Sequence, residues 1–206
     1  MYRSGEYGIA EGKFMKKWLL PLSLTVLLGG CILGPQTVEV VPDIKVAERT
    51  AQLSGPVAVT VYDERTTPQL GTRGGIYKTT NFIYLDEQFA HSIKIAVDNA
   101  LRSMGMEPVS STDVPQVQVY MDELSYTVPY GDYVSGVDLK AAMRVEILKE
   151  GRRYAGRYVS EDHYRTIKAP SDSQNEEMVN AIINKVLARA MDDQALLNFL
   201  GGATGS

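Results

Sequence analysis

The chain has 206 residues, with 21 Lys and Arg against 25 Asp and Glu, and a formal net charge of −4. An acidic chain gains nothing from neutralising phosphates, which argues against nucleic acid as a partner and against a polybasic patch for anionic lipids. The single cysteine, Cys31, excludes an intramolecular disulfide.

The stretch from Met15 to Cys31 has the order of an export signal. Two lysines follow Met15, an apolar run of 11 residues extends from Trp18 to Leu28, and two small residues, Gly29 and Gly30, precede the cysteine. A membrane-spanning helix needs about 20 apolar residues, so this run is too short to be retained as a span. We therefore expect residues 15–30 to be a signal peptide that is removed.

The sequence Leu28-Gly29-Gly30-Cys31 resembles a bacterial lipobox. The resemblance implies that a diacylglyceryl group alkylates the Cys31 thiol and that, after cleavage, the new amino group is acylated. Ile32 stands where Asp commonly retains such lipoproteins in the inner membrane, which implies the outer membrane, periplasmic face. The alternative is an ordinary signal peptide with a chance cysteine.

Composition divides the residues before and after the signal peptide into four segments. Residues 1–14 precede the natural start at Met15 and are interpreted as an upstream start-site extension. Residues 31–54 contain two prolines and few large apolar residues, which favours a lipidated tether, with room for a short strand or a segment laid along the domain. Residues 55–200 are predicted to form a single α+β domain, and residues 201–206 a flexible tail.

Hydrophobic periodicity predicts two helices. The first covers about residues 87–104, with Asp86 as a plausible N-cap and Gly105 as its stop, and the second follows Pro170. Residues 195–200 either continue the second helix or form a short final turn. The predicted apolar faces are Phe89, Ile93, Ala96, Val97, Ala100, Leu101 and Met104 on the first helix, and Met178, Ile182, Ile183, Val186, Leu187, Ala190 and Met191 on the second.

Alternating or β-branched runs predict strands at residues 57–62, 117–124, 137–150 and 153–166, with an extended segment or edge strand at 76–85. Gly151 favours a tight hairpin between the last two strands, because glycine adopts positive φ without strain. The expected fold class is α+β: a mixed, mostly antiparallel sheet of about four to five strands with two amphipathic helices packed on one face.

Four short motifs resemble the YajG-type family of bacterial lipoproteins. They are residues 37–42 (TVEVVP), 59–65 (VTVYDER), 70–73 (LGTR) and 198–200 (NFL). The resemblance extends over nearly the whole mature chain, and its most specific part is Asp63-x-Arg65 followed by Leu70-Gly71-x-Arg73. It implies an envelope lipoprotein with a single domain, and it implies no activity.

Asp63, Arg65 and Arg73 form the first candidate site. Either arginine could clamp a carboxylate or phosphate through paired hydrogen bonds. The alternative is structural: Asp63 accepts from turn amides and an arginine, and thereby fixes a long turn.

Tyr126, Tyr130 and Tyr133 form the second candidate, a partner-binding loop, because tyrosine is enriched at interfaces. Half-buried packing on the sheet is the alternative.

A catalytic set is hard to assemble from these residues. Acylation of Cys31 removes the thiol, no GxSxG elbow is present, and the glycine-rich stretch 71–75 lacks the GK[ST] ending of a phosphate loop. His91 is predicted to face solvent, and neither it nor His163 has a metal-ligand spacing. We predict no catalytic residues, no metal and no cofactor.

The sequence therefore predicts a non-enzymatic, acyl-anchored envelope lipoprotein with a periplasm-facing binding or assembly domain. Its expected partners are the membrane, through the lipid on Cys31, and an envelope protein; the oligomeric state is left open. The alternative function is binding of a small anionic ligand or cell-wall fragment through Asp63, Arg65 and Arg73.

Overall fold

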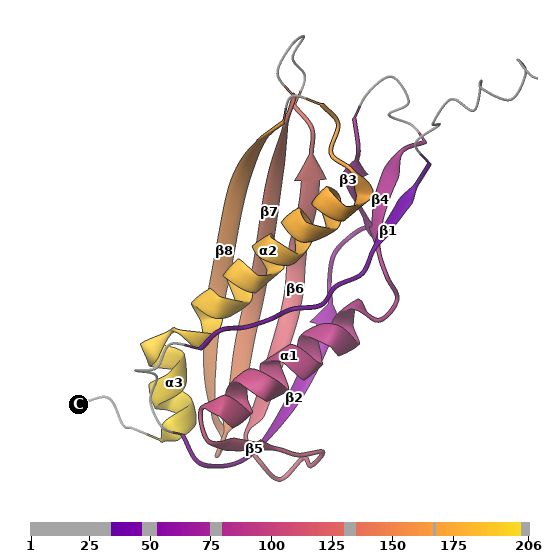
Figure 1. The fold of residues 1–206 in the computed structure, drawn as a ribbon. Helices are drawn as coiled ribbons and strands as arrows, with labels where there is room; N and C mark the ends of the chain where they lie inside the picture. The colour runs from indigo at the N-terminus through magenta and orange to yellow at the C-terminus, as the bar shows by residue number, and fades with distance from the viewer. Residues whose placement is uncertain (1–33, 47–52, 75–79, 130–134, 167, 203–206) are drawn as a thin grey trace, which may run out of the picture. The chain divides into compact units, whose positions relative to one another are not determined.

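A mixed sheet with three long strands is the main feature of the computed structural model, which describes residues 34–46, 53–74, 80–129, 135–166 and 168–202. Within these residues all three helices lie in front of the sheet in Figure 1. The elements in chain order are β1 Gln36–Val38, β2 Gly55–Asp63, β3 Gln69–Thr72, β4 Phe82–Leu85, α1 Phe89–Ser103, β5 Met106–Pro108, β6 Gln116–Thr127, β7 Ser135–Lys149, β8 Arg152–Thr166, α2 Asp172–Met191 and α3 Gln194–Gly201.

The strand order branches at β6. One edge of β6 pairs antiparallel with β7, which pairs antiparallel with β8, while the other edge is shared by two parallel neighbours, β2 and β3. β3 meets β6 where Gly71 pairs with Tyr126. A Cβ atom on residue 71 would lie 1.7 Å from the carbonyl oxygen of Tyr126, so this contact requires glycine. Gly71 in the LGTR motif thus has a packing role.

The α+β class is confirmed, but the predicted numbers of elements are wrong. The described residues contain eight strands rather than four to five, and three helices rather than two. The additional strands β1, β3 and β5 have three or four residues each, too few to show an alternating pattern. They are strands because distant segments supply their hydrogen bonds: β4 pairs with β1, and β2 pairs with β5.

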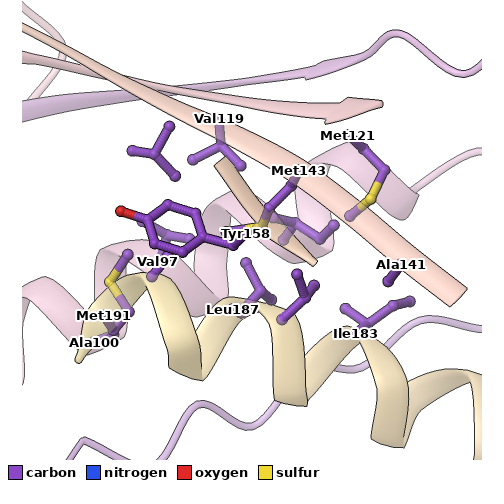
Figure 2. Packing of buried hydrophobic residues seen from close by; sticks show 14 of the residues in the cluster. Val97, Ala100, Val119, Met121, Ala141, Met143, Tyr158, Ile183, Leu187 and Met191 are labelled. Carbon is purple, nitrogen blue, oxygen red and sulfur yellow. The ribbon is translucent and has the colours of Figure 1, made fainter. Parts of the chain in front are cut away.

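The two predicted apolar helix faces are confirmed, since every residue in both sets is buried. Figure 2 shows Ile183, Leu187 and Met191 of α2 directed at the sheet residues Met143 and Val119. Each fully buried aliphatic side chain contributes about 1.5–3 kcal/mol of transfer free energy. The two helices therefore cover one face of the sheet and form its core.

The helix ends agree only in part with those predicted from the sequence. α2 begins with a capping box, in which the Ser171 side chain accepts from the Gln174 amide and Gln174 accepts from the Ser171 amide. The Asp86 prediction is wrong: α1 begins after Gln88, which makes no side-chain cap. The β7–β8 hairpin is confirmed, with positive φ at Glu150 and Gly151.

Residues 34–46, here called the N-terminal strap, lie along the domain. Their strand β1 pairs with β4, and the chain then passes beside α2, where the Asn180 and Asn184 side chains accept from the backbone amides of Val41 and Asp43 at 2.8 Å each. Figure 1 shows this segment crossing between α1 and α2. The sequence left room here for a short strand or a segment laid along the domain, and these residues contain both.

A half-buried carboxylate, that of Asp193, joins α3 to β8. The hydroxyls of Tyr154 and Tyr158 both donate to Asp193 Oδ2 at 2.7 Å, and Asp193 also caps α3 by accepting from the Ala195 amide at 2.8 Å. Burial raises the pKa of Asp193, but these hydrogen bonds outweigh it and hold the pKa below its ordinary value. The last helix is thus held by an ionised group.

We expect the Asp193→Asn variant to lose stability in a pH-dependent way. A carboxylate with a depressed pKa stabilises the fold above about pH 4, its unfolded pKa, and this contribution is lost as pH falls through the folded pKa. Denaturant unfolding should show a cost of about 1–2 kcal/mol near neutral pH. The difference from wild type should shrink toward pH 3; a constant difference would contradict this role.

Candidate functional site

The predicted cluster of Asp63, Arg65 and Arg73 is divided between two places. Arg65 donates from Nε to Asp63 Oδ1 at 2.8 Å and from Nη2 to Oδ2 at 2.7 Å, and its guanidinium carbon lies 5.1 Å from the centre of the Phe89 ring on α1. Its side chain is 6% exposed. Arg65 therefore fastens the end of β2 to α1.

Arg73 has different partners. It is buried, and its Nη2 pairs with the Asp172 carboxylate at the start of α2 and donates to the Pro170 carbonyl at 3.4 Å. Both arginines are thus occupied by partners inside the domain. The two guanidinium groups do not form one exposed anion clamp, and this corrects the functional interpretation of the cluster.

Tyr126 is also not part of an exposed loop. It belongs to β6, is 2% exposed and donates to Asn175 Oδ1 at 2.7 Å. Burial raises its pKa to about 12, against a smaller opposing effect of Arg73. The partner-loop prediction is therefore wrong for Tyr126, while Tyr130 and Tyr133 lie outside the described residues.

The sheet face opposite the helices carries a different set of side chains, which we call the open face. Its central row runs across β2, β6, β7 and β8, where Tyr62, Tyr120, Arg144 and Arg157 are successive partners in register. The rings of Tyr62 and Tyr120 stack with centroids 4.9 Å apart, and the Arg144 guanidinium lies 4.7 Å from the Tyr120 ring. Such aromatic and arginine side chains are typical of protein interfaces.

Carboxylates surround Arg144. Its Nε contacts Asp122 at 3.0 Å, its Nη2 contacts Glu64 at 2.5 Å and its Nη1 contacts Glu146 at 3.5 Å. The hydrogen bond to Asp122 raises the pKa of Arg144. Asp122 follows Tyr120 by two residues and so lies on the same face of β6, and it is the extra residue of a bulge between Met121 and Glu123.

Arg157 has a contrasting environment. It is exposed and lies directly opposite Arg144 in the β7–β8 register. Like charges in directly opposed strand positions are destabilising. Within the described ranges no ion pair involves Arg157. Among the described residues Arg157 is thus an exposed cation beside Arg144, without an ion pair of its own.

A groove of about 480 Å³ continues the open face toward the far ends of β7 and β8. It is lined by Ser125, Thr127, Asp138, Leu139, Lys140, Glu161, Asp162 and His163. His163 Nδ1 lies 2.6 Å from Asp138 Oδ1, and Lys140 pairs with Glu123 at 3.0 Å. The charged side chains of the groove are thus held in ion pairs, some of them with residues outside it.

In the part of the chain that the structure describes, no three His, Cys, Asp or Glu side chains come together as metal ligands. His91 is exposed on α1, as its position off the apolar stripe predicts, and His163 is exposed on β8.

The sequence prediction missed the open face as a site. Its signal is present in β6 and β7, where Gln118, Tyr120 and Arg144, each partly exposed, alternate with buried apolar residues. Alternation identifies such a face, but it does not tell which residues of different strands are opposite one another. The register of the sheet brings Arg157 to Arg144.

The fold and the open face define an α+β domain with helices on one side of a mixed sheet. The chain belongs to a family described as uncharacterized lipoprotein, whose model matches residues 42–201. This confirms the YajG-type resemblance. The search of curated proteins gave no match. None of the helices in the described residues is long and apolar enough to cross a membrane.

The solved structures that match the chain share little sequence with it. Protein XCC0632 from Xanthomonas campestris is 9% identical with a TM-score of 0.50, covering 81% of this chain and 96% of its own. Rare lipoprotein B from Shewanella oneidensis is 8% identical with a TM-score of 0.38 (70% and 94%), and lipoprotein GNA1162 from Neisseria meningitidis 10% identical with a TM-score of 0.31 (65% and 98%). The first of these supports the fold assignment.

Proposed function

We propose that the protein is a non-catalytic envelope lipoprotein, anchored by acyl groups on Cys31 to the periplasmic face of the outer membrane, whose domain binds an envelope protein through the open face. The lipoprotein family and the lipobox support the anchor, and Ile32 supports the outer membrane. The observation that carries the binding proposal is Arg157, an exposed cation held opposite Arg144, whose guanidinium in turn lies against the Tyr62–Tyr120 stack.

Charge indicates what kind of partner fits. The carboxylates nearest the centre of the open face already pair with Arg144 or Arg153, so none of the described acidic groups there is left free for a basic partner. Arg157 and Arg165 are exposed and point to a partner that supplies carboxylates. Stacked tyrosines favour a protein surface, because their rings provide contact area at a low entropic cost. We therefore assign a protein with an acidic contact surface.

The Arg157→Glu variant tests this proposal. Removing one of two opposed cations relieves their repulsion, but a glutamate at position 157 adds a carboxylate near the three that already contact Arg144. The free energy of unfolding should therefore stay within about 0.5 kcal/mol of wild type. Binding of the partner should weaken at least about tenfold, which is about 1.4 kcal/mol. Arg102→Glu, an identical charge change on the exposed side of α1, is the matched control and should leave binding unchanged.

The partner is first captured by photocrosslinking in cells. A benzoylphenylalanine at position 62, on the open face, should crosslink to a discrete protein, whereas position 95 on α1 should not; Tyr62 and Ile95 are 40% and 46% exposed. The captured protein is then purified and titrated with both charge variants. Equal affinity of Arg157→Glu and wild type would contradict the proposed interface.

A further inference from the structure

We propose that the lipid anchor holds one defined end of the domain directly against the surface of the membrane. This end, here called the anchor end, comprises the start of β1, the C-terminal end of β8 and the N-terminus of α2, and it includes Gln36, Thr166 and Asp172. The inference rests on the proposed acylation of Cys31. The partner of the anchor end is the layer of lipid headgroups.

The anchor end is joined to the strap by buried hydrogen bonds. Gln36 is 6% exposed; its Nε2 donates to the Asp172 carbonyl at 2.7 Å, and its Oε1 accepts from Asn175 Nδ2 at 2.8 Å. Asn175 in turn accepts from the Tyr126 hydroxyl on β6. A residue close behind the lipidation point is thus fixed both to α2 and to the centre of the sheet.

The rest of the strap is fastened as well. Asn180 accepts from the Val41 amide and donates to the Glu39 carbonyl at 2.9 Å, and Val38 accepts from the Asp86 amide at 3.1 Å. The strap therefore has side-chain or backbone partners on α2 and beside β4. A pull on its first residue is transmitted to the domain without an intervening free linker.

The length of chain before the strap limits the distance to the lipid. The compact unit begins at Gly34, three residues after Cys31, and three consecutive Cα–Cα steps extend at most about 11 Å. In contrast, β8 runs for 15 residues from the hairpin to the anchor end, which corresponds to about 50 Å. The anchor end therefore lies at the headgroups, and the β7–β8 hairpin points away from them.

Site-specific fluorescence quenching tests this orientation. Because Cys31 is the single cysteine and its thiol is consumed by the acyl group, an introduced cysteine is the one thiol available for a fluorophore. Ala169→Cys labels the anchor end, and Thr112→Cys labels the opposite end; both residues are exposed. The full lipidated chain is reconstituted in phosphatidylethanolamine and phosphatidylglycerol vesicles that carry nitroxide headgroups.

The label at residue 169 should lose most of its emission, while the label at 112 should keep it, a severalfold difference in quenching. A flexible Gly-Ser insertion of about 20 residues between Leu33 and Gly34 adds a root-mean-square reach of roughly 25 Å and should remove most of that difference. Equal quenching at both positions in the uninserted protein would overturn the orientation. Failure of the protein to float with the vesicles would instead contradict the lipidation.

Discussion

The Cys31→Ser protein is expected to leave the membrane fraction and to remain folded. The lipobox resemblance implies that the Cys31 thiol is alkylated, and serine has no thiol to take up this lipid. Each acyl CH₂ that no longer enters the bilayer removes about 0.8 kcal/mol of membrane affinity. One acyl chain binds reversibly, whereas several give stable anchoring. The domain should keep its unfolding midpoint, because Cys31 precedes the compact unit that begins at Gly34.

The measurement separates membrane and soluble fractions after a high-salt wash, with the mass of the mature protein as a second readout. The serine variant is expressed behind a conventional cleavable secretory signal, so that an uncleaved apolar run does not hold it at the membrane. Wild type should gain the mass of its acyl groups and sediment with outer membranes in a density gradient. A serine variant that stays fully membrane-bound would refute the acyl anchor.

The features predictable from the sequence are those with a local signal. The apolar stripe from Phe89 to Met104 and that from Met178 to Met191 repeat at helical spacing, and the structure buries both. Gly151 predicts the hairpin that joins β7 and β8, and the structure shows positive φ at this residue. These features depend on neighbouring residues along the chain, and local pattern is therefore sufficient to find them.

The features that the sequence missed depend on distant partners. Tyr126 looks like a loop residue, yet the bulge at Asp122 moves Leu124 and Tyr126 onto the buried face of β6. Likewise, Arg65 and Arg73 look like one cluster in the sequence, but α1 supplies the contact of the first and α2 that of the second. Register and tertiary packing decide such roles, and neither leaves a trace in the local pattern.

The most consequential of these hidden contacts is the buried set formed by Asn175, Tyr126 and Gln36. Asn175 is fully buried. Its side chain accepts from the Tyr126 hydroxyl on β6 and donates to the side-chain oxygen of Gln36 in the strap. Replacing it by leucine leaves the Tyr126 hydroxyl and the Gln36 carbonyl oxygen without these partners. Each unsatisfied buried group costs about 1–3 kcal/mol.

We expect Asn175→Leu to lower the free energy of unfolding by about 2–5 kcal/mol and the melting temperature by roughly 5–15 °C.

A double-mutant cycle tests whether the two side chains act together. Tyr126→Phe alone should cost about 1 kcal/mol of unfolding free energy. In the Asn175→Leu background it should cost less or become stabilising, because it removes a hydroxyl that has already lost its acceptor; the coupling should reach about 1–2 kcal/mol. Tyr62→Phe, on the open face, is the matched control and should stay within about 0.5 kcal/mol. Additive costs for Asn175→Leu and Tyr126→Phe would show that the two side chains do not act as one network.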